Sequence, residues 1–230
     1  MLNFVISIDG PAGSGKSTLA HNLSQRLQFL HVDSGALYRA ATWQALNEGI
    51  DTSDTQAIES FAKHLQMEFS VSNKKVIFTI EGKMLGNALR SAEVNAHVSP
   101  VAAVPAVRQR ITEWLREMRE LGPLVVEGRD IGSVVFPDAT AKFYLETDQV
   151  ERAKRRHAEE IEKGIAAAGS DQASVLESLR NRDRIDSSRK AAPLKVPEGA
   201  LIIDNTFSTP EQTLEKALAV LPLEVRNIIG

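Results

Sequence analysis

Short apolar runs alternate along this chain with longer segments in which apolar residues recur every three or four positions. The runs lie at 4–8, 29–32, 124–127, 141–145 and 200–204. Such runs, bounded by turn or polar residues, are typical of buried parallel strands, whereas the longer spacing is typical of amphipathic helices. The alternation therefore predicts an α/β fold, a doubly wound, five-stranded parallel sheet flanked by helices. Ligands of such sheets bind at the carboxyl ends of the strands.

One segment interrupts this alternation. Residues 67–71 and 76–80 have strand composition and are joined by the polar residues 72–75, which predicts a β-hairpin. We therefore predict an inserted subdomain at about 63–95 within a single domain spanning 1–230.

After this insert the chain is expected to return to the core through 91–94. A helix then follows from about 105 to 120. Pro100 and Pro105 are expected to bend its entry, and Pro105 suits the first turn of a helix because it needs no intrahelical partner for a backbone N–H.

A basic segment follows the fourth predicted strand. Thr147 and Asp148 can cap a helix over about 149–163, whose basic residues are Arg152, Lys154, Arg155 and Arg156. Gly164 and Gly169 then flank an alanine-rich connection. A basic helix next to a flexible connection predicts a lid over about 150–185, although a solvated charged helix has the same pattern.

The most specific motif is a phosphate-binding loop between the first predicted strand and the first predicted helix. Its residues are Gly10, Pro11, Ala12, Gly13, Ser14, Gly15, Lys16, Ser17 and Thr18. Glycines let backbone N–H groups converge on phosphate oxygens, Lys16 adds a full positive charge, and Ser17 offers a hydroxyl to Mg²⁺. The motif predicts binding of a nucleoside triphosphate, but it serves kinases, switches and motors alike.

Composition narrows the classes of protein. The sequence has no cysteine, which excludes disulfides, zinc–thiolate sites and thiol catalysis.

No apolar stretch approaches the length of a membrane span or resembles a signal peptide, so we expect a cytoplasmic protein. The net charge of −3 argues against a general nucleic-acid surface, while local arginine clusters suggest small anionic ligands. No heptad run calls for a partner chain, so we expect a monomer.

Charged residues follow the second and third predicted strands. After the second come Asp33, Ser34 and Arg39, and Arg39 could hold an acceptor phosphate by a bidentate contact. The alternative is a capping aspartate with a surface ion pair. Glu127, Gly128, Arg129 and Asp130 end the third strand, where a kinase needs a carboxylate near magnesium and a cation near the phosphates. A turn whose charges pair only with one another is the alternative.

Residues 180–189 form the last charged cluster. On a helix, Arg182, Asp186 and Arg189 fall at i, i+4 and i+7 and share one face, which could grip a sugar and a phosphate. Taken alone, such a segment is equally typical of a solvated ion-pair helix.

In their order and spacing, the segments 8–18, 33–39, 127–137 and 182–189 resemble those of bacterial cytidylate kinases, within the nucleoside monophosphate kinase group. The resemblance covers essentially the whole chain. It implies a P-loop kinase sheet in the order 2-3-1-4-5, a lid over ATP, and an insert that enlarges the acceptor site. The implied reaction is transfer of the γ-phosphoryl group of ATP, with Mg²⁺, to CMP or dCMP.

The resemblance also implies roles for single residues. Cytosine would be read by Ser99, Arg108 and Asp130, since a carboxylate facing its amino group disfavours uracil. The acceptor phosphate would be surrounded by Arg39, Arg129 and Arg189, with Ser34 nearby, and the pentose reached by Arg182 and Asp186. Lys16, Arg129, Arg155 and Arg189 are the candidates for catalysis, with Arg152 and Arg156 as further candidates for neutralising charge during transfer.

This sequence departs from the pattern of the family at two places. Glu127 stands where many relatives carry aspartate, and Ile185 and Ser187 stand where some carry further basic residues. These departures leave open how the water shell of Mg²⁺ is held and how strongly the last helix attracts anions.

Three other readings of the sequence remain. A GTPase would need a guanine-reading Asn-Lys-x-Asp motif, which the sequence lacks. A nucleic-acid-binding protein would be expected to interleave aromatic residues with its arginines. A P-loop kinase for another small acceptor, UMP or AMP, is the nearest alternative, and only the acceptor-side residues separate it from the cytidylate reading.

Overall fold

A seven-stranded sheet forms the centre of the computed structural model, which describes residues 4–162, 164, 166 and 169–226. The strands are β1 (Val5–Asp9), β2 (Leu30–Asp33), β3 (Glu68–Ser72), β4 (Lys75–Thr79), β5 (Leu124–Gly128), β6 (Ala141–Glu146) and β7 (Leu201–Asp204). They lie in the order β3-β4-β2-β5-β1-β6-β7. The five strands expected from the apolar runs are all present and parallel, and their relative order is 2-3-1-4-5.

The expected number of five strands is wrong for the whole sheet, because the hairpin joins it. β3 and β4 pair antiparallel, and β4 continues the sheet beside β2 through the register His31–Lys75. In addition, the backbone N–H of His31 donates to Lys74 O at 2.8 Å. The hairpin thus satisfies backbone groups that β2 would otherwise leave unpaired at an edge.

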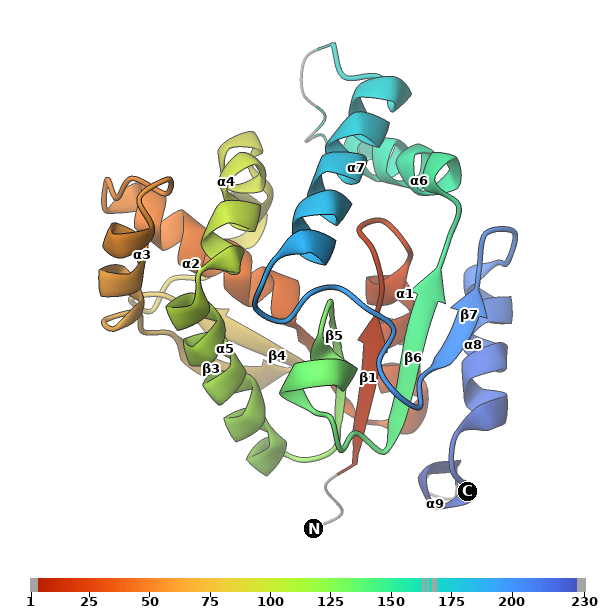
Figure 1. Ribbon diagram of the computed structural model, residues 1–230. Coiled ribbons are helices and arrows are strands. Elements are labelled where there is room, and N and C mark those ends of the chain that lie inside the picture. The colour runs from red at the N-terminus through yellow and green to blue at the C-terminus, as the bar shows by residue number, and fades with distance from the viewer. Residues whose placement is uncertain (1–3, 163, 165, 167–168, 227–230) are drawn as a thin grey trace.

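Helices cover both faces of the sheet (Figure 1). The α-helices are α1 (Lys16–Leu27), α2 (Ser34–Asn47), α3 (Thr55–Ala62), α4 (Ala92–Ala103), α5 (Pro105–Glu117), α6 (Gln149–Glu162), α7 (Gln172–Ser188), α8 (Pro210–Val220) and α9 (Leu223–Arg226). Two short 3₁₀ helices, η1 (Gly86–Arg90) and η2 (Met118–Leu121), and one turn of π-helix, η3 (Ile131–Val135), complete the described elements.

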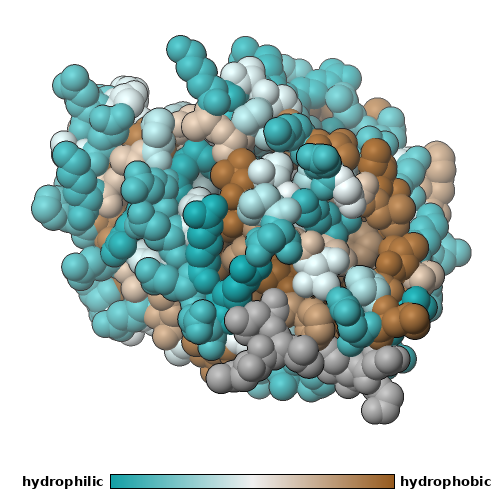
Figure 2. Space-filling view, turned by 60° about the horizontal axis from the view of Figure 1, so that its bottom comes forward, coloured by the Kyte–Doolittle hydropathy of each residue, from teal (hydrophilic) through white to brown (hydrophobic). Residues whose placement is uncertain are grey.

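Two apolar clusters hold the layers together. One lies between the sheet and α1, α8 and α9, and includes Ile8, Leu23, Phe143 and Ala217. The other lies on the opposite face, beneath α2, α3, α4 and α5, and includes Trp114. Figure 2 shows hydrophilic residues over much of one face and hydrophobic ones gathered toward one side. Within the described residues, no helix combines the length and apolar character needed to cross a membrane.

The segment before α5 differs from the prediction. Residues 92–103 form a separate helix, α4, and Pro100 lies inside it rather than bending the entry to α5. A proline inside a helix removes one hydrogen bond, and α4 ends three residues after Pro100. Pro105 occupies the first turn of α5, as predicted.

The lid region is only partly within the described residues. Asp148 caps α6 by accepting from the backbone N–H groups of Val150 and Glu151, as the sequence suggested. Lys163, the expected last residue of this helix, lies outside the described residues. In Figure 1, α6 and α7 lie above the carboxyl ends of the parallel strands, where a ligand of this sheet would bind.

Candidate active site

A cleft of about 660 Å³ opens at the carboxyl ends of β1, β2 and β5. Loop residues on its wall are Ala12, Gly13, Gly15, Lys16, Ser17 and Thr18. Every residue expected at the acceptor side also lines it, namely Ser34, Arg39, Ser99, Arg108, Arg129, Asp130, Arg182, Asp186 and Arg189. Motifs from distant parts of the sequence therefore meet in one cavity.

The phosphate-binding loop is held in shape by its surroundings. Gly10 has φ 150°, and a side chain there would meet Leu145 O at 2.6 Å, so this position requires glycine. Arg152 Nη1 donates to Ala12 O at 2.9 Å, and Asn205 Nδ2 donates to Ser14 O at 2.9 Å. The loop conformation is thus fixed by the backbone and by neighbours from α6 and the end of β7.

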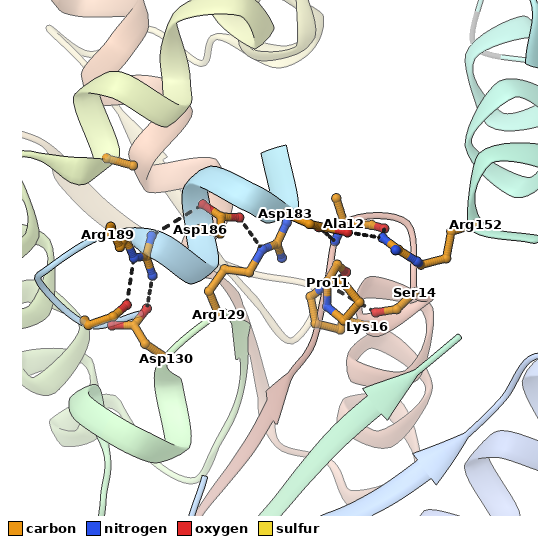
Figure 3. Close-up of polar contacts among 12 residues, drawn as sticks. Pro11, Ala12, Ser14, Lys16, Arg129, Asp130, Arg152, Asp183, Asp186 and Arg189 are labelled. Carbon is orange, nitrogen blue, oxygen red and sulfur yellow. Dashed lines mark hydrogen bonds and ion pairs between the residues drawn. The ribbon is translucent and has the colours of Figure 1, made fainter. Parts of the chain in front are cut away.

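Lys16 folds back over this loop. Its Nζ donates to Pro11 O at 2.6 Å and lies 3.4 Å from Ser14 Oγ (Figure 3). Burial lowers the pKa of Lys16 well below its ordinary value, and the nearby Arg129 lowers it further. A buried cation beside another cation is stabilised by an anionic ligand, and a nucleotide phosphate supplies that charge.

Ser17 is connected to the third parallel strand. Its Oγ donates to Glu127 Oε2 at 2.7 Å, and Glu127 Oε1 lies 3.1 Å from His31 Nε2. Glu127 thus stands beside the loop at the end of β5, as the sequence predicted. The oxygens of Ser17 and Glu127 have the chemistry that Mg²⁺ prefers.

The start of α2 forms one wall of the acceptor side. Asp33 caps this helix by accepting from Ala36 N, and Arg39 Nη2 donates to Asp33 Oδ2 at 3.0 Å. Burial lowers the pKa of Arg39. Its Nε is buried and has no hydrogen-bond partner among the described residues. The Asp33–Arg39 ion pair is largely buried and is not a surface pair, and Arg39 also lines the cleft.

Two carboxylates, Asp130 and Asp186, pair with three further arginines of the acceptor side (Figure 3). Asp130 pairs with Arg108 from α5 and with Arg189, 3.5 Å away. Asp186 pairs with Arg129 at 2.9 Å and with Arg189 at 3.5 Å. Burial would raise the pKa of Asp186, but its arginine neighbours hold it below the ordinary value. The acceptor side is thus a network of buried guanidinium and carboxylate groups.

Arg182 and Asp186 reach this network from α7, whereas Arg189 lies just beyond the end of that helix. The expected common helix face is correct for Arg182 and Asp186 only, because α7 ends at Ser188 and Arg189 has an extended backbone. Arg182 Nε is buried and has no hydrogen-bond partner in the part of the chain that the structure describes. Burial lowers the pKa of Arg182 to about 9, and its neighbour Arg129 adds to the shift.

The arginines of α6 occupy different places. Arg155 and Arg156 line the cleft. Arg155 Nη2 donates to Asn205 O and Thr206 O, both at 2.9 Å, and Arg156 pairs with Glu159 and Glu160. Arg152 instead joins Ala12 O to Asp183, whose other oxygen accepts from Ala12 N at 3.2 Å. Arg152 therefore supports the loop from behind.

The sequence reasoning missed several residues of the cleft. Arg90, at the end of η1, lines it and pairs with Glu159 of α6 at 3.4 Å. Tyr38 lies beneath Arg108, with 5.2 Å from the guanidinium carbon to the ring centroid. Outside the lining residues, His31 was also missed, and it is buried beside Glu127. The one available signal was a histidine inside an otherwise apolar strand, since a buried polar side chain requires a partner.

Comparisons with known proteins show which family this chain resembles. A family model described as Cytidylate kinase matches residues 6–222. The chain is 39% identical over 219 residues to a cytidylate kinase of Geobacillus sp. (strain WCH70), covering 95% of this chain and 96% of that one. It is 40% identical over 215 residues to a cytidylate kinase of Pseudomonas paraeruginosa (strain DSM 24068 / PA7), covering 92% of each.

A solved structure shares the fold. The crystal structure of an uncharacterized protein from Eubacterium ventriosum ATCC 27560 aligns with a TM-score of 0.51 and 11% identity, covering 95% of this chain and 98% of that chain. At this level of identity the likeness concerns the fold alone.

Proposed function

The chain belongs to the cytidylate kinase family, and we propose that its cleft carries out the ATP-dependent phosphorylation of CMP or dCMP with the residue roles given below. The products are ADP and CDP or dCDP. The observation that supports these roles best is that Lys16 of the loop and the trio Ser99, Arg108 and Asp130 line one cleft. One end of the cleft thus suits a triphosphate, and the other suits a cytosine nucleotide.

At the donor end, the loop would bind the phosphates of ATP. Backbone N–H groups at the start of α1 and the charge of Lys16 meet the phosphate oxygens. Lys16 donates to Pro11 O, and on binding of ATP this contact would be exchanged for one with a phosphate.

The residues beside the loop fit Mg²⁺. Among the described residues, no group of three or more histidine, cysteine or acidic side chains could hold a metal ion alone. Mg²⁺ in phosphoryl-transfer sites is held by one or two protein groups together with substrate phosphates, and Ser17 with Glu127 provides such a pair. The ion would neutralise charge on the donor phosphates.

At the acceptor end, the roles follow from position and charge. Arg39, Arg129 and Arg189 would surround the acceptor phosphate, with Ser34 nearby, while Arg182 and Asp186 reach the pentose. Asp130 would accept from the exocyclic amino group of cytosine, since its carboxylate is held by Arg108. Uracil presents a carbonyl at that place, which the carboxylate would repel.

The chemical step needs little covalent participation by the protein. An oxygen of the acceptor phosphate forms a bond to the γ-phosphorus, and the bond from that phosphorus to the bridging oxygen of ADP breaks. A phosphate monoester has its second pKa near 6, so the attacking oxygen is largely deprotonated at neutral pH. The protein contributes alignment and positive charge, from Lys16, Arg129 and Arg189, with Arg155 at the wall near α6.

An acceptor screen tests this proposal. Purified protein with ATP and Mg²⁺ is assayed for ADP release with CMP, dCMP, UMP and AMP at equal concentrations. We expect kcat/KM for CMP or dCMP to exceed that for UMP by about 10²-fold or more, because a misplaced acceptor faces the Asp130 carboxylate. Equal turnover of UMP would contradict the role of the base-reading trio.

A further inference from the structure

His31 is a buried polar residue of β2, between the apolar residues Leu30 and Val32. Its exposed fraction is 5%, and its ring lies 6.5 Å from that of His21 on α1. Val125, its register partner on β5, belongs to the apolar cluster under α1. A polar ring at this place is costly unless its nitrogens have partners, and Glu127 provides one.

The direction of the hydrogen bonds follows from the chemistry of the groups. Glu127 Oε2 accepts from the hydroxyl of Ser17, and a carboxylate only accepts. His31 Nε2 must then be the donor to Oε1, at 3.1 Å. Both oxygens of Glu127 are thereby held, one from β2 and one from the first turn of α1.

This arrangement also fixes the hydroxyl of Ser17. A serine hydroxyl rotates freely unless its proton is engaged. Here the proton points at Glu127, which leaves the lone pairs of Oγ for a cation. Without His31, the carboxylate of Glu127 could turn about its terminal torsion, which has a broad energy profile, and the Ser17 proton would lose its fixed acceptor.

We propose that His31 is a positioning residue for the magnesium side of the donor site, acting on Ser17 through the carboxylate of Glu127. The proposal rests on the proposed function in one respect, that Mg²⁺ binds with ATP beside Ser17. The proposal adds His31, from β2, to the residues that act at the donor site. It also gives the glutamate at position 127 a physical role, which is to connect His31 with Ser17.

The test measures how much Mg²⁺ strengthens nucleotide binding. Calorimetry gives the Kd of a non-hydrolysable ATP analogue with excess Mg²⁺ and with EDTA, and the ratio of the two values is the magnesium enhancement. We expect His31→Leu to lower this enhancement about tenfold, as the loss of residues that orient metal ligands does elsewhere. His31→Gln, whose side-chain amide can still donate to Glu127, should retain most of it.

A double-mutant cycle separates positioning from general stabilisation. If His31 acts through Glu127, then adding His31→Leu to Glu127→Ala should change the enhancement no further. Effects that simply add would overturn the proposal. His31→Asn, which stays polar but reaches less far, serves if the leucine variant does not fold, and it should lose part of the enhancement. Full retention in His31→Asn would also overturn the proposal.

A matched control lies elsewhere in the molecule. His97 Nδ1 pairs with Thr52 Oγ1 at 2.6 Å, and His97→Leu removes a comparable hydrogen bond outside the loop. We expect this control to lower the melting temperature and leave the enhancement intact. The same pattern in His31→Leu would overturn the proposal. The assay contains no acceptor, so a failed acceptor screen with an intact enhancement would contradict the proposed function alone.

Discussion

The two ends of the cleft are built in different ways. At the donor end, one continuous loop supplies the site, and contacts from Asn205, Arg152 and Asp183 to its backbone hold its shape. At the acceptor end, side chains from α2, α4, α5, α7 and the turn after β5 converge. There the groups are held by one another, through carboxylates shared between arginines.

This difference determines what ligand binding must change. The donor loop needs only the exchange of the Lys16–Pro11 contact for a phosphate. The three arginines expected around the acceptor phosphate, Arg39, Arg129 and Arg189, are already paired, so a phosphate there must share or replace the carboxylates of Asp33 and Asp186. A single substitution at the donor end should therefore have a large effect, because few groups bind the donor. A single substitution at the acceptor end should have a moderate effect, because many groups share the binding of the acceptor.

The largest effect is expected at the donor end. Lys16→Met removes the one lysine charge at the loop, and we expect kcat to fall about 10²–10³-fold, as for loss of a preorganised group that stabilises developing charge. Steady-state ADP release measures it. Lys154→Met, on an exposed lysine of α6, is the control and should leave kcat within a factor of two. A Lys16→Met enzyme with undiminished kcat would show that the loop binds ATP without the lysine.

The donor end was predictable from sequence because its parts are adjacent in sequence. Glycines, lysine and serine at fixed spacing between a strand and a helix specify the loop. The five parallel strands were predictable for a similar reason, since each is a short apolar run. The attachment of the hairpin to β2 was not, because it depends on backbone pairing between His31 and Lys75, which no composition pattern records.

A moderate effect is expected at the acceptor end. Asp130→Ala should weaken acceptor binding or transition-state stabilisation by about 1.5–3 kcal/mol, the range for a hydrogen bond to a charged group. That corresponds to about a 10- to 150-fold loss of kcat/KM for CMP. The Kd for ATP should stay nearly unchanged, because Asp130 contacts Arg108 and Arg189 and not the loop.

Asp138→Ala is the control for this variant. Asp138 also pairs with an arginine, Arg119, but its side chain is 64% exposed, so its loss should have little effect on either substrate. If ATP binding collapsed together with CMP turnover in Asp130→Ala, the two ends of the cleft would be coupled, and Asp130 would have a structural role.

The acceptor end was only partly predictable. Asp33, Arg39 and the 127–130 turn follow strands, so their meeting at one sheet edge could be inferred. Ser99 and Arg108 carry no local signal, and only the resemblance pointed to them. Arg90 was missed because an arginine at the end of a short helical turn has no distinguishing pattern, and its approach to Glu159 arises from tertiary packing.

The smallest effect concerns Arg182, which lies at the acceptor end near Arg129 and Asp186. Its pKa is lowered to about 9 by burial and then by Arg129, and its Nε has no hydrogen-bond partner among the described residues, so its positive charge is poorly compensated there. We expect Arg182→Met to raise KM for CMP about 3- to 10-fold, through loss of one hydrogen bond. The same change should raise the free energy of unfolding by about 0.5–2 kcal/mol, because it removes the repulsion between Arg182 and Arg129. Replacing a destabilising functional residue commonly stabilises a protein by this amount.

Urea unfolding without nucleotide measures the second part of this prediction. Arg184→Met is the matched control, since Arg184 is exposed on the same helix and contacts Asn181 only through one hydrogen bond. A lower unfolding midpoint for Arg182→Met than for Arg184→Met would mean that Asp186 outweighs the repulsion from Arg129. In that case the carboxylates of the acceptor end would already compensate its positive charges. The two ends would then differ only in whether one loop or several elements supply the site.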